Sequence, residues 1–136
     1  MNEETQSVGL AAQIAGVFLA GGVGATLRVL LAAKVEDVLT DKLPFVGVLV
    51  CNLIGCLVIG FASAAISTPH WRQIVLGGLL GGFTTYSAFA LFSVSLIGEG
   101  RSGALAVQLG LHLVGGVACV WIGMWLARSA GLVAAT

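Results

Sequence analysis

The chain has 136 residues, of which 58% are hydrophobic and 9% charged, and its formal net charge is zero. Soluble domains carry about 25% charged residues, so a soluble protein this apolar would lack the side chains to cover its surface. The balanced charge also argues against nucleic acid as a partner, because domains that bind nucleic acid carry an excess of Lys and Arg.

Four long stretches without a charged residue indicate helices that cross a membrane. Residues 8–27, 43–71, 73–98 and 102–127 contain no Asp, Glu, Lys or Arg. Each is long enough for a membrane-spanning helix, which needs about 20 predominantly apolar residues. The sequence therefore predicts an all-α, multi-pass protein of the cell (inner) membrane, with a single transmembrane domain over residues 1–136. We place its four helices at about residues 8–33, 44–67, 71–97 and 102–128.

The first predicted helix has small residues on one face and a basic residue near its end. Gly16, Ala20 and Gly24 recur at every fourth position, a spacing that lets helices pack closely in lipid. Arg28 either extends to the membrane interface or attracts anions into a vestibule. The polar stretch over residues 34–42 is the predicted first loop.

The second predicted helix begins at Pro44 and carries an amide in its middle. Asn52 is expected near the bilayer centre, where a polar group is costly unless it is hydrogen-bonded. One interpretation is a polar contact between helices. The other is a pore-facing residue, because the two N–H groups of the amide can replace water around an anion.

The third predicted helix combines glycines with hydroxyl side chains. Four of residues 77–82 are glycine, and each weakens a helix by about 1 kcal/mol relative to alanine. Thr84, Thr85 and Ser87 follow, and their hydroxyls can satisfy backbone groups that leave a helix. The pattern fits either glycine-mediated packing or a helix break that is buried in protein or lines a cavity.

The fourth predicted helix contains Gln108 and a lone histidine, His112, and repeats the small-residue spacing with Gly115, Cys119 and Gly123. A histidine in such a position is either a packed, hydrogen-bonded residue or a ligand or proton relay. No carboxylate lies within any predicted span, which argues against proton-coupled carboxylate exchange and acid–base hydrolysis, so we expect no enzyme activity. The polar groups within the spans are Asn52, Thr84, Thr85, Tyr86, Ser87, Gln108 and His112.

Three segments, in this order and at these spacings, resemble the motifs of the Fluc (CrcB-like) fluoride channels. Residues 21–28 read GGVGATLR, residues 47–55 read GVLVCNLIG, and residues 78–89 read GLLGGFTTYSAF. Each segment alone is a weak signal, but together on four spans they are specific. The resemblance covers roughly residues 14–126.

The resemblance implies an antiparallel, dual-topology dimer in the lipid bilayer, formed with a second copy of the chain or with a paralogous chain. Two fluoride pores would lie at the dimer interface. The resemblance also implies a third helix that is broken near its middle, between Gly81 and Tyr86. Its main-chain carbonyls would hold a structural sodium ion, with Gly81 and Thr84 as the matching positions. By the resemblance, Asn52, Tyr86 and Phe89 match pore residues of the family. We also place Thr85, Ser87 and His112 in the pore and Arg28 in the vestibule.

The basic residues specify the orientation only weakly. With four spans, both termini lie on one side of the membrane, together with Arg72 and Arg128, whereas the other side holds four basic residues. Because Lys and Arg favour the cytoplasmic side, this difference is a mild bias toward termini outside, and it is compatible with insertion in both orientations.

Five positions depart from the family pattern. Val48 replaces a threonine, Tyr86 a phenylalanine and Phe92 a glutamate, while Gln108 and His112 replace a tyrosine and a serine of the fourth helix. Several polar positions along the implied pore are thus altered. Both a homodimer and one half of a heterodimer remain open, as does conduction through each pore.

The leading functional hypothesis is a passive channel that exports fluoride, since neutral donors and aromatic edges can replace the water of a small anion without trapping it. A small multidrug-resistance-type, proton-coupled exporter is the alternative from another class. It has a similar length and helix number but needs a glutamate within its first span, and this sequence has none there. A non-conducting structural subunit is a further alternative, favoured by the changes in the fourth helix.

Overall fold

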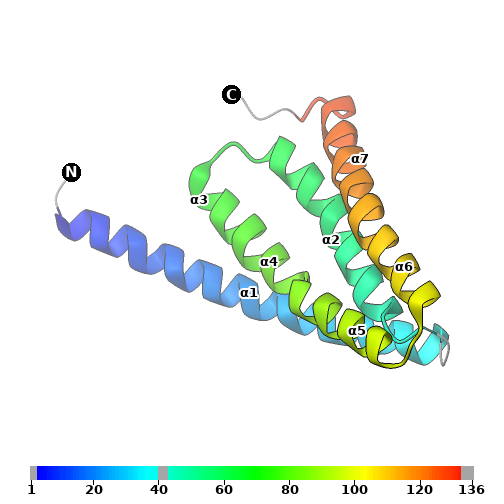
Figure 1. Cartoon of the computed structure of the whole chain (residues 1–136). Helices are drawn as coiled ribbons and strands as arrows, with labels where there is room; N and C mark the ends of the chain where they lie inside the picture. Colours follow the sequence, from blue (N-terminus) through cyan, green and yellow to red (C-terminus); the bar gives the residue numbers. More distant parts are fainter. Residues whose placement is uncertain (1–2, 40–42, 133–136) are drawn as a thin grey trace.

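The computed structural model describes residues 3–39 and 43–132, and all regular structure within these ranges is helical (Figure 1). Two segments, η1 and η2, are π-helical, with wider turns than an α-helix. The elements in chain order are α1 (Glu3–Leu39), α2 (Val46–Ala65), α3 (Pro69–Arg72), η1 (Gln73–Leu80), α4 (Gly81–Phe83), α5 (Tyr86–Gly98), α6 (Ser102–Gly110), η2 (Leu111–Gly115) and α7 (Gly116–Ser129).

Within the described residues, these elements form four helical spans that are long and apolar enough to cross a membrane, so the prediction of four transmembrane helices is confirmed. The elements from α3 to α5 make the third span, and α6, η2 and α7 make the fourth. In Figure 1, α2 runs beside α7, and the third span lies along α1, whose first turns extend beyond the other helices. The spans are Gly9–Val38, Val46–Ala65, Pro69–Gly98 and Ser102–Ser129.

The first helix is longer than expected. It was predicted to end near residue 33 and to be followed by a loop, but α1 continues to Leu39. Residues 34–39 contain neither Gly nor Pro, and Lys and Glu are good helix formers, so nothing in this stretch ends the helix. Charged residues mark where a helix leaves the membrane core, which is a different point from where the helix stops. The rest of the predicted loop, residues 40–42, lies outside the described residues.

Glycine closes the contact between α1 and the third span. A methyl group added at Gly24 would overlap the carbonyl of Leu79, and one added at Gly82 would overlap the carbonyl of Gly21. The two helices therefore approach until backbone meets backbone, which is how small residues favour helix association in lipid. Gly77, by contrast, faces open space, so only part of the glycine run serves this packing.

The contact between α2 and α7 uses the same arrangement. A methyl group at Gly60 would overlap the carbonyl of Val120, and one at Gly123 would overlap the carbonyl of Leu57. Each helix thus offers one glycine to the backbone of the other. This pairing fixes the second span against the fourth, and both spans line the groove described in the next subsection.

The third helix is broken near its middle, as predicted. Thr84 and Thr85 have extended backbone angles, with ψ of 157° and 114°, between the end of α4 at Phe83 and the start of α5 at Tyr86. The amide of Thr84 still donates to the carbonyl of Leu80 (2.9 Å), so the break begins immediately after it. Both interpretations of the glycine run therefore apply, glycine-mediated packing before the break and the break itself at the threonines.

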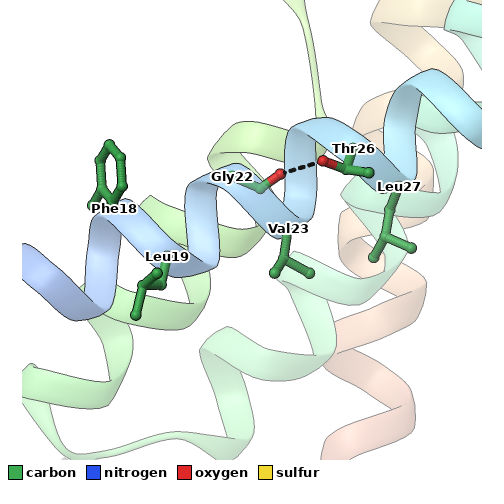
Figure 2. A pocket seen from close by; sticks show the side chains of 6 residues that line it. All are labelled: Phe18, Leu19, Gly22, Val23, Thr26 and Leu27. Carbon is green, nitrogen blue, oxygen red and sulfur yellow. Dashed lines mark hydrogen bonds between the residues drawn. The ribbon is translucent and has the colours of Figure 1, made fainter.

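One outer face of α1 is apolar and is not covered by the other described residues. Phe18 and Leu19 keep 77% and 66% of their surface exposed. Figure 2 shows the shallow groove that runs along this face, with the other helices behind α1. In a membrane protein such a face meets either lipid or another chain. The groove is lined by Phe18, Leu19, Gly22, Val23, Thr26 and Leu27.

Candidate functional site

Asn52 ties α2 to the break in the third span. Its Nδ2 donates to the carbonyl of Thr85 (3.0 Å), and its Oδ1 accepts from the amide of Thr85 (2.8 Å). One side chain thus satisfies both backbone groups of a residue that belongs to no helix, at a depth where water is scarce. The polar contact between helices is therefore present. It uses one of the two N–H groups of Nδ2, and the second remains able to donate elsewhere.

Thr85 also starts the second half of the broken helix. Its Oγ1 accepts a hydrogen bond from the amide of Ala88 (3.2 Å), which makes Thr85 the N-cap residue of α5. A threonine in this position satisfies one of the amides that have no partner at a helix start. The hydroxyls of Thr85 and Ser87 lie 3.1 Å apart and share a hydrogen bond.

The same contacts leave two main-chain carbonyls without their usual donors. In a continuous helix the carbonyl of Gly81 would accept from the amide of Thr85, and the carbonyl of Thr84 from the amide of Ala88. Those amides instead donate to the Asn52 side chain and to the Thr85 hydroxyl. Because of these side-chain contacts, the break leaves the carbonyls of Gly81 and Thr84 without their helical donors.

Arg28 contacts the same break from α1. Its Nε donates to the carbonyl of Gly82 (3.2 Å), so this carbonyl has a charged partner. The carbonyls of Gly81 and Thr84, in contrast, lose their helical donors. The carbonyl of Arg28 in turn lies 3.6 Å from the Sγ of Cys51 on α2. Arg28 thus sits where α1, α2 and the third span meet, and its charge lies beside the break.

An open groove of about 290 Å³ lies next to the break, between α2, α5 and the fourth span. Its lining brings together five of the residues that the sequence placed in a pore, from three separate spans. Ser87 and Arg28 are outside the lining. The groove is lined by Asn52, Gly55, Cys56, Ile59, Thr84, Thr85, Tyr86, Phe89, His112 and Leu113.

Sequence reasoning missed part of the α2 wall of this groove. Gly55, Cys56 and Ile59 follow Asn52 at three, four and seven positions, so all four residues lie on one helical face. That periodicity was the available signal, because a pore-facing Asn52 places these neighbours beside it. At Gly55 an added methyl group would overlap the side chain of Thr84, so a larger residue would close the groove at the break.

A row of three rings forms the opposite wall. The ring centroids of Tyr86 and Phe89 are 5.5 Å apart, and those of Phe89 and His112 are 4.6 Å apart, both pairs at tilted angles. The edges of aromatic rings carry partial positive charge and can face an anion. Tyr86 keeps 79% of its surface exposed, whereas Phe89 keeps 9%. The row thus runs from the open side of the groove toward the interior.

Gln108 lies inside the helix bundle and is absent from the groove lining. It is fully buried, and its Nε2 donates to the carbonyl of Phe89 (2.8 Å) and to the hydroxyl of Ser93 (3.2 Å). Both of its N–H groups are therefore used to hold α6 against α5. The sequence identified Gln108 as a polar residue within the membrane but could not say which neighbour it faces.

His112 has one fixed hydrogen bond and one free nitrogen. Its Nδ1 lies 3.0 Å from the carbonyl of Gln108, and because a carbonyl only accepts, Nδ1 must carry the hydrogen. Its Nε2 is buried and has no hydrogen-bond partner within residues 3–39 and 43–132, and neither has the Oε1 of Gln108. Among these residues the groove lining contains no Asp, Glu, Lys or Arg, so its polarity comes from neutral groups.

Comparison with known proteins gives consistent results over most of the chain. The family described as "CrcB-like protein, Camphor Resistance (CrcB)" matches residues 15–124. The chain is 41% identical to the fluoride-specific ion channel FluC of Dichelobacter nodosus over 117 residues, which is 83% of this chain and 94% of the relative. The proteins of the same name from Burkholderia thailandensis and Burkholderia lata are 36% and 38% identical over 121 residues, 85% of this chain and 93% of each relative.

Proposed function

Because the chain belongs to the CrcB-like family, we propose that it is a passive, fluoride-selective channel that exports fluoride across the cell membrane. The observation that carries the proposal is the groove beside the helix break, where Asn52 and the ring row face a space whose lining, among the described residues, has no Asp, Glu, Lys or Arg. The relatives named fluoride-specific ion channels support the choice of ion.

The groove suits a small anion for a physical reason. An ion that enters a narrow membrane path must lose water, and the path must replace that water without binding the ion too tightly to release it. Asn52 retains one amide hydrogen for this purpose, since its other polar contacts are already made with Thr85. The edges of the Tyr86 and Phe89 rings add weaker positive potential along the same wall.

The proposal includes a dimer, because one chain leaves its groove open and its α1 face uncovered. Tyr86 is mostly exposed, and the apolar groove of Figure 2 offers a surface for close helix packing around Gly22. We propose that a second copy, or a paralogous chain, packs in the antiparallel orientation and completes the pore wall. The weak difference in basic residues between the two sides is compatible with either insertion.

We further propose a structural sodium ion at the break. The carbonyls of Gly81 and Thr84, which lose their helical donors to Asn52 and Thr85, are neutral oxygen ligands of the kind that a hard cation accepts. The ion would supply positive charge that stabilises these carbonyls at mid-membrane. Replacing sodium in all buffers by N-methylglucamine should then abolish fluoride flux, and restoring sodium should recover it.

The multidrug-exporter alternative lacks its central residue. α1 contains no carboxylate between residues 5 and 35, and Glu36 and Asp37 lie exposed near its C-terminal end. A proton-coupled exchange of that type needs an acidic group within the span. One observation supports the non-conducting alternative. Gln108 donates both amide hydrogens to groups of α5, so it offers none to an ion.

Fluoride efflux from liposomes tests the proposal. Purified protein is reconstituted as the only chain, the vesicles are loaded with potassium fluoride, and an electrode follows release after valinomycin is added. We expect rapid fluoride release and no release of chloride from matched vesicles. Release of both anions would contradict selectivity. Absence of release by this chain alone, with release in the presence of a paralogue, would support the heterodimer; absence in both cases would overturn the proposal.

A further inference from the structure

We propose that His112 is a proton-controlled residue of the groove, and that its protonation places a positive charge beside the ion path which holds fluoride and slows its passage. The inference rests on the proposed fluoride-channel function and deepens it. It concerns a residue for which the resemblance gives only a serine as counterpart, so the geometry of this chain must carry the argument.

The hydrogen bonds around the ring define what a proton would do. Nδ1 donates to the carbonyl of Gln108, so in the neutral ring the only place for another proton is Nε2. Nε2 takes that proton from a hydronium ion, so one N–H bond forms, one O–H bond of the hydronium breaks, and a water molecule is released. The neutral ring therefore presents a bare lone pair, whereas the protonated ring carries a full positive charge.

Two buried atoms of His112 and Gln108 lack a hydrogen-bond partner in the described part of the chain. Nε2 of His112 and Oε1 of Gln108 are both buried, both acceptors, and both without a partner in the described part of the chain. They belong to residues four positions apart, which lie on the same face of a helix. Two buried acceptors without a donor are unfavourable. One proton turns Nε2 into a donor and so removes one of the two unpaired acceptors.

The ring lies where its charge would reach an ion. His112 lines the groove with Asn52, and its ring centroid is 4.6 Å from that of Phe89. Nε2 itself lies beneath the surface, so a fluoride ion in the groove would experience the charge of the ring without being bonded to that nitrogen. Coulomb attraction needs no contact, and it is strong where water is excluded.

Among the titratable side chains that line the groove, the imidazole is the one that gains a positive charge. The titratable side chains around the groove are the Cys56 thiol on α2 and the Tyr86 phenol on α5, and Cys119 on α7 lies within electrostatic range of Cys56. Ordinary thiols and phenols titrate at higher pH than imidazole. Within the described residues no Asp, Glu, Lys or Arg lines the groove. Imidazole changes charge between about pH 5 and 8.

Protonation should slow transport, because conduction requires an ion to leave its site as well as to enter it. We expect fluoride efflux from liposomes, buffered to the same pH inside and outside, to fall at least about fivefold from about pH 7.5 to about pH 5.5. The concentration of fluoride that half-saturates the flux should fall as well. Leak of hydrogen fluoride through the lipid is subtracted with protein-free vesicles.

Two variants test whether His112 causes the pH dependence of the flux. In His112→Asn the amide nitrogen takes the place of Nδ1, so the bond to the Gln108 carbonyl is kept and the titrating group is removed; flux should no longer depend on pH. His70 is the other histidine of the chain and lies exposed at α3, so His70→Asn should retain the pH dependence of the wild type. The ¹⁵N signals of labelled histidine in His70→Asn then report the protonation of His112 alone.

The outcomes separate this inference from the proposed function. Fluoride flux at about pH 7.5 tests the channel itself. If that flux is present but is unchanged or faster at acid pH, the inference is overturned while the channel stands. A ring that stays neutral throughout this range by ¹⁵N signals also overturns it. Loss of the pH dependence in His112→Asn, together with its retention in His70→Asn, supports it.

Discussion

The third span is held in two different ways on the two sides of its break. Before Thr84, the contact with α1 is made mainly by backbone against backbone, with Gly24 against Leu79 and Gly82 against Gly21. One side chain of α1, Arg28, adds a hydrogen bond at the end of this contact. After Thr85, polar side chains from other helices make the connection, with Asn52 bonded to Thr85 and Gln108 to Phe89. Glycines let two helices approach closely in lipid and hold them together by shape complementarity. Side-chain amides, in contrast, fix individual backbone groups by hydrogen bonds.

This difference separates stability from function along one helix. The glycines before Thr84 contribute to the contact that holds α1 and the third span together. The polar contacts at and after Thr85 hold the groove lining and the ring row in place. They also leave the carbonyls of Gly81 and Thr84 without their helical donors, so the proposed ion path depends on these contacts. Substitutions on the two sides should therefore fail in different ways, the first by loss of folded protein and the second by loss of flux.

The largest effect on folding is expected at the glycine contact. Gly82→Leu would drive a side chain into the carbonyl of Gly21, and overpacking of this kind costs about 1–3 kcal/mol or more. We expect loss of folded protein in detergent, measured by size-exclusion chromatography and thermal unfolding. Gly77→Leu, in the same span but facing open space, is the matched control and should fold normally. Equal behaviour of the two variants would contradict the packing account.

Asn52→Asp should abolish fluoride flux while the protein still folds. The carboxylate can still accept from the amide of Thr85, but it loses the N–H groups and brings a negative charge to the groove. Two like charges about 4 Å apart repel by about 4 kcal/mol at an effective dielectric constant of 20, which corresponds to roughly a thousandfold in rate. Efflux from liposomes measures the effect, and wild-type flux in a folded variant would show that Asn52 does not face the ion.

A native cysteine offers a test of the groove. Cys56 lies in its lining, whereas Cys51 is fully buried. A silver ion or a small thiol reagent that reaches Cys56 should block most of the fluoride flux. The block should persist when Cys51 and Cys119 are replaced by serine and disappear when Cys56 is replaced. Block that survives the loss of Cys56 would place the sensitive thiol elsewhere and count against the groove as the ion path.

The smallest effect is expected at Gln108. Gln108→Leu removes two hydrogen bonds, but the hydroxyl of Ser93 still donates to the Phe89 carbonyl (2.9 Å), and the unpartnered Oε1 is removed as well. We expect destabilisation of about 1 kcal/mol and a few-fold change in flux through the position of Phe89. Gln73→Leu, at an exposed site in the third span, should leave both unchanged. Complete loss of flux in a stable Gln108→Leu protein would instead assign Gln108 to the ion path.

Much of the architecture was predictable because charge defines membrane spans. The uncharged stretches identified four helices, and the spacing of small residues identified Gly24 and Gly123, both of which make backbone contacts. The end of the first helix was wrong by several residues, since the charged residues 34–39 suit a helix as well as a loop. Local composition reports where a chain leaves the membrane better than where its helix ends.

The details of the site were less accessible from sequence. The glycine run could not decide between packing and a break, and the break falls at Thr84 and Thr85, after the last glycine. The side chain of Asn52, on another helix, stabilises that break by its hydrogen bonds with Thr85. The local sequence around the break cannot predict such a long-range contact. The inward orientation of Gln108 and the π-helical turns η1 and η2 depend on neighbouring helices in the same way. The roles of the groove residues, the sodium ion and the dimer stay predictions.

The central claim is that this chain forms a passive path selective for fluoride. Current through a planar bilayer that contains the protein, with fluoride on one side and chloride on the other, tests it most directly. The account predicts a current that reverses near the equilibrium potential of fluoride and vanishes in Asn52→Asp. A current that reverses near the chloride potential, or one that Asn52→Asp leaves unchanged, would contradict it.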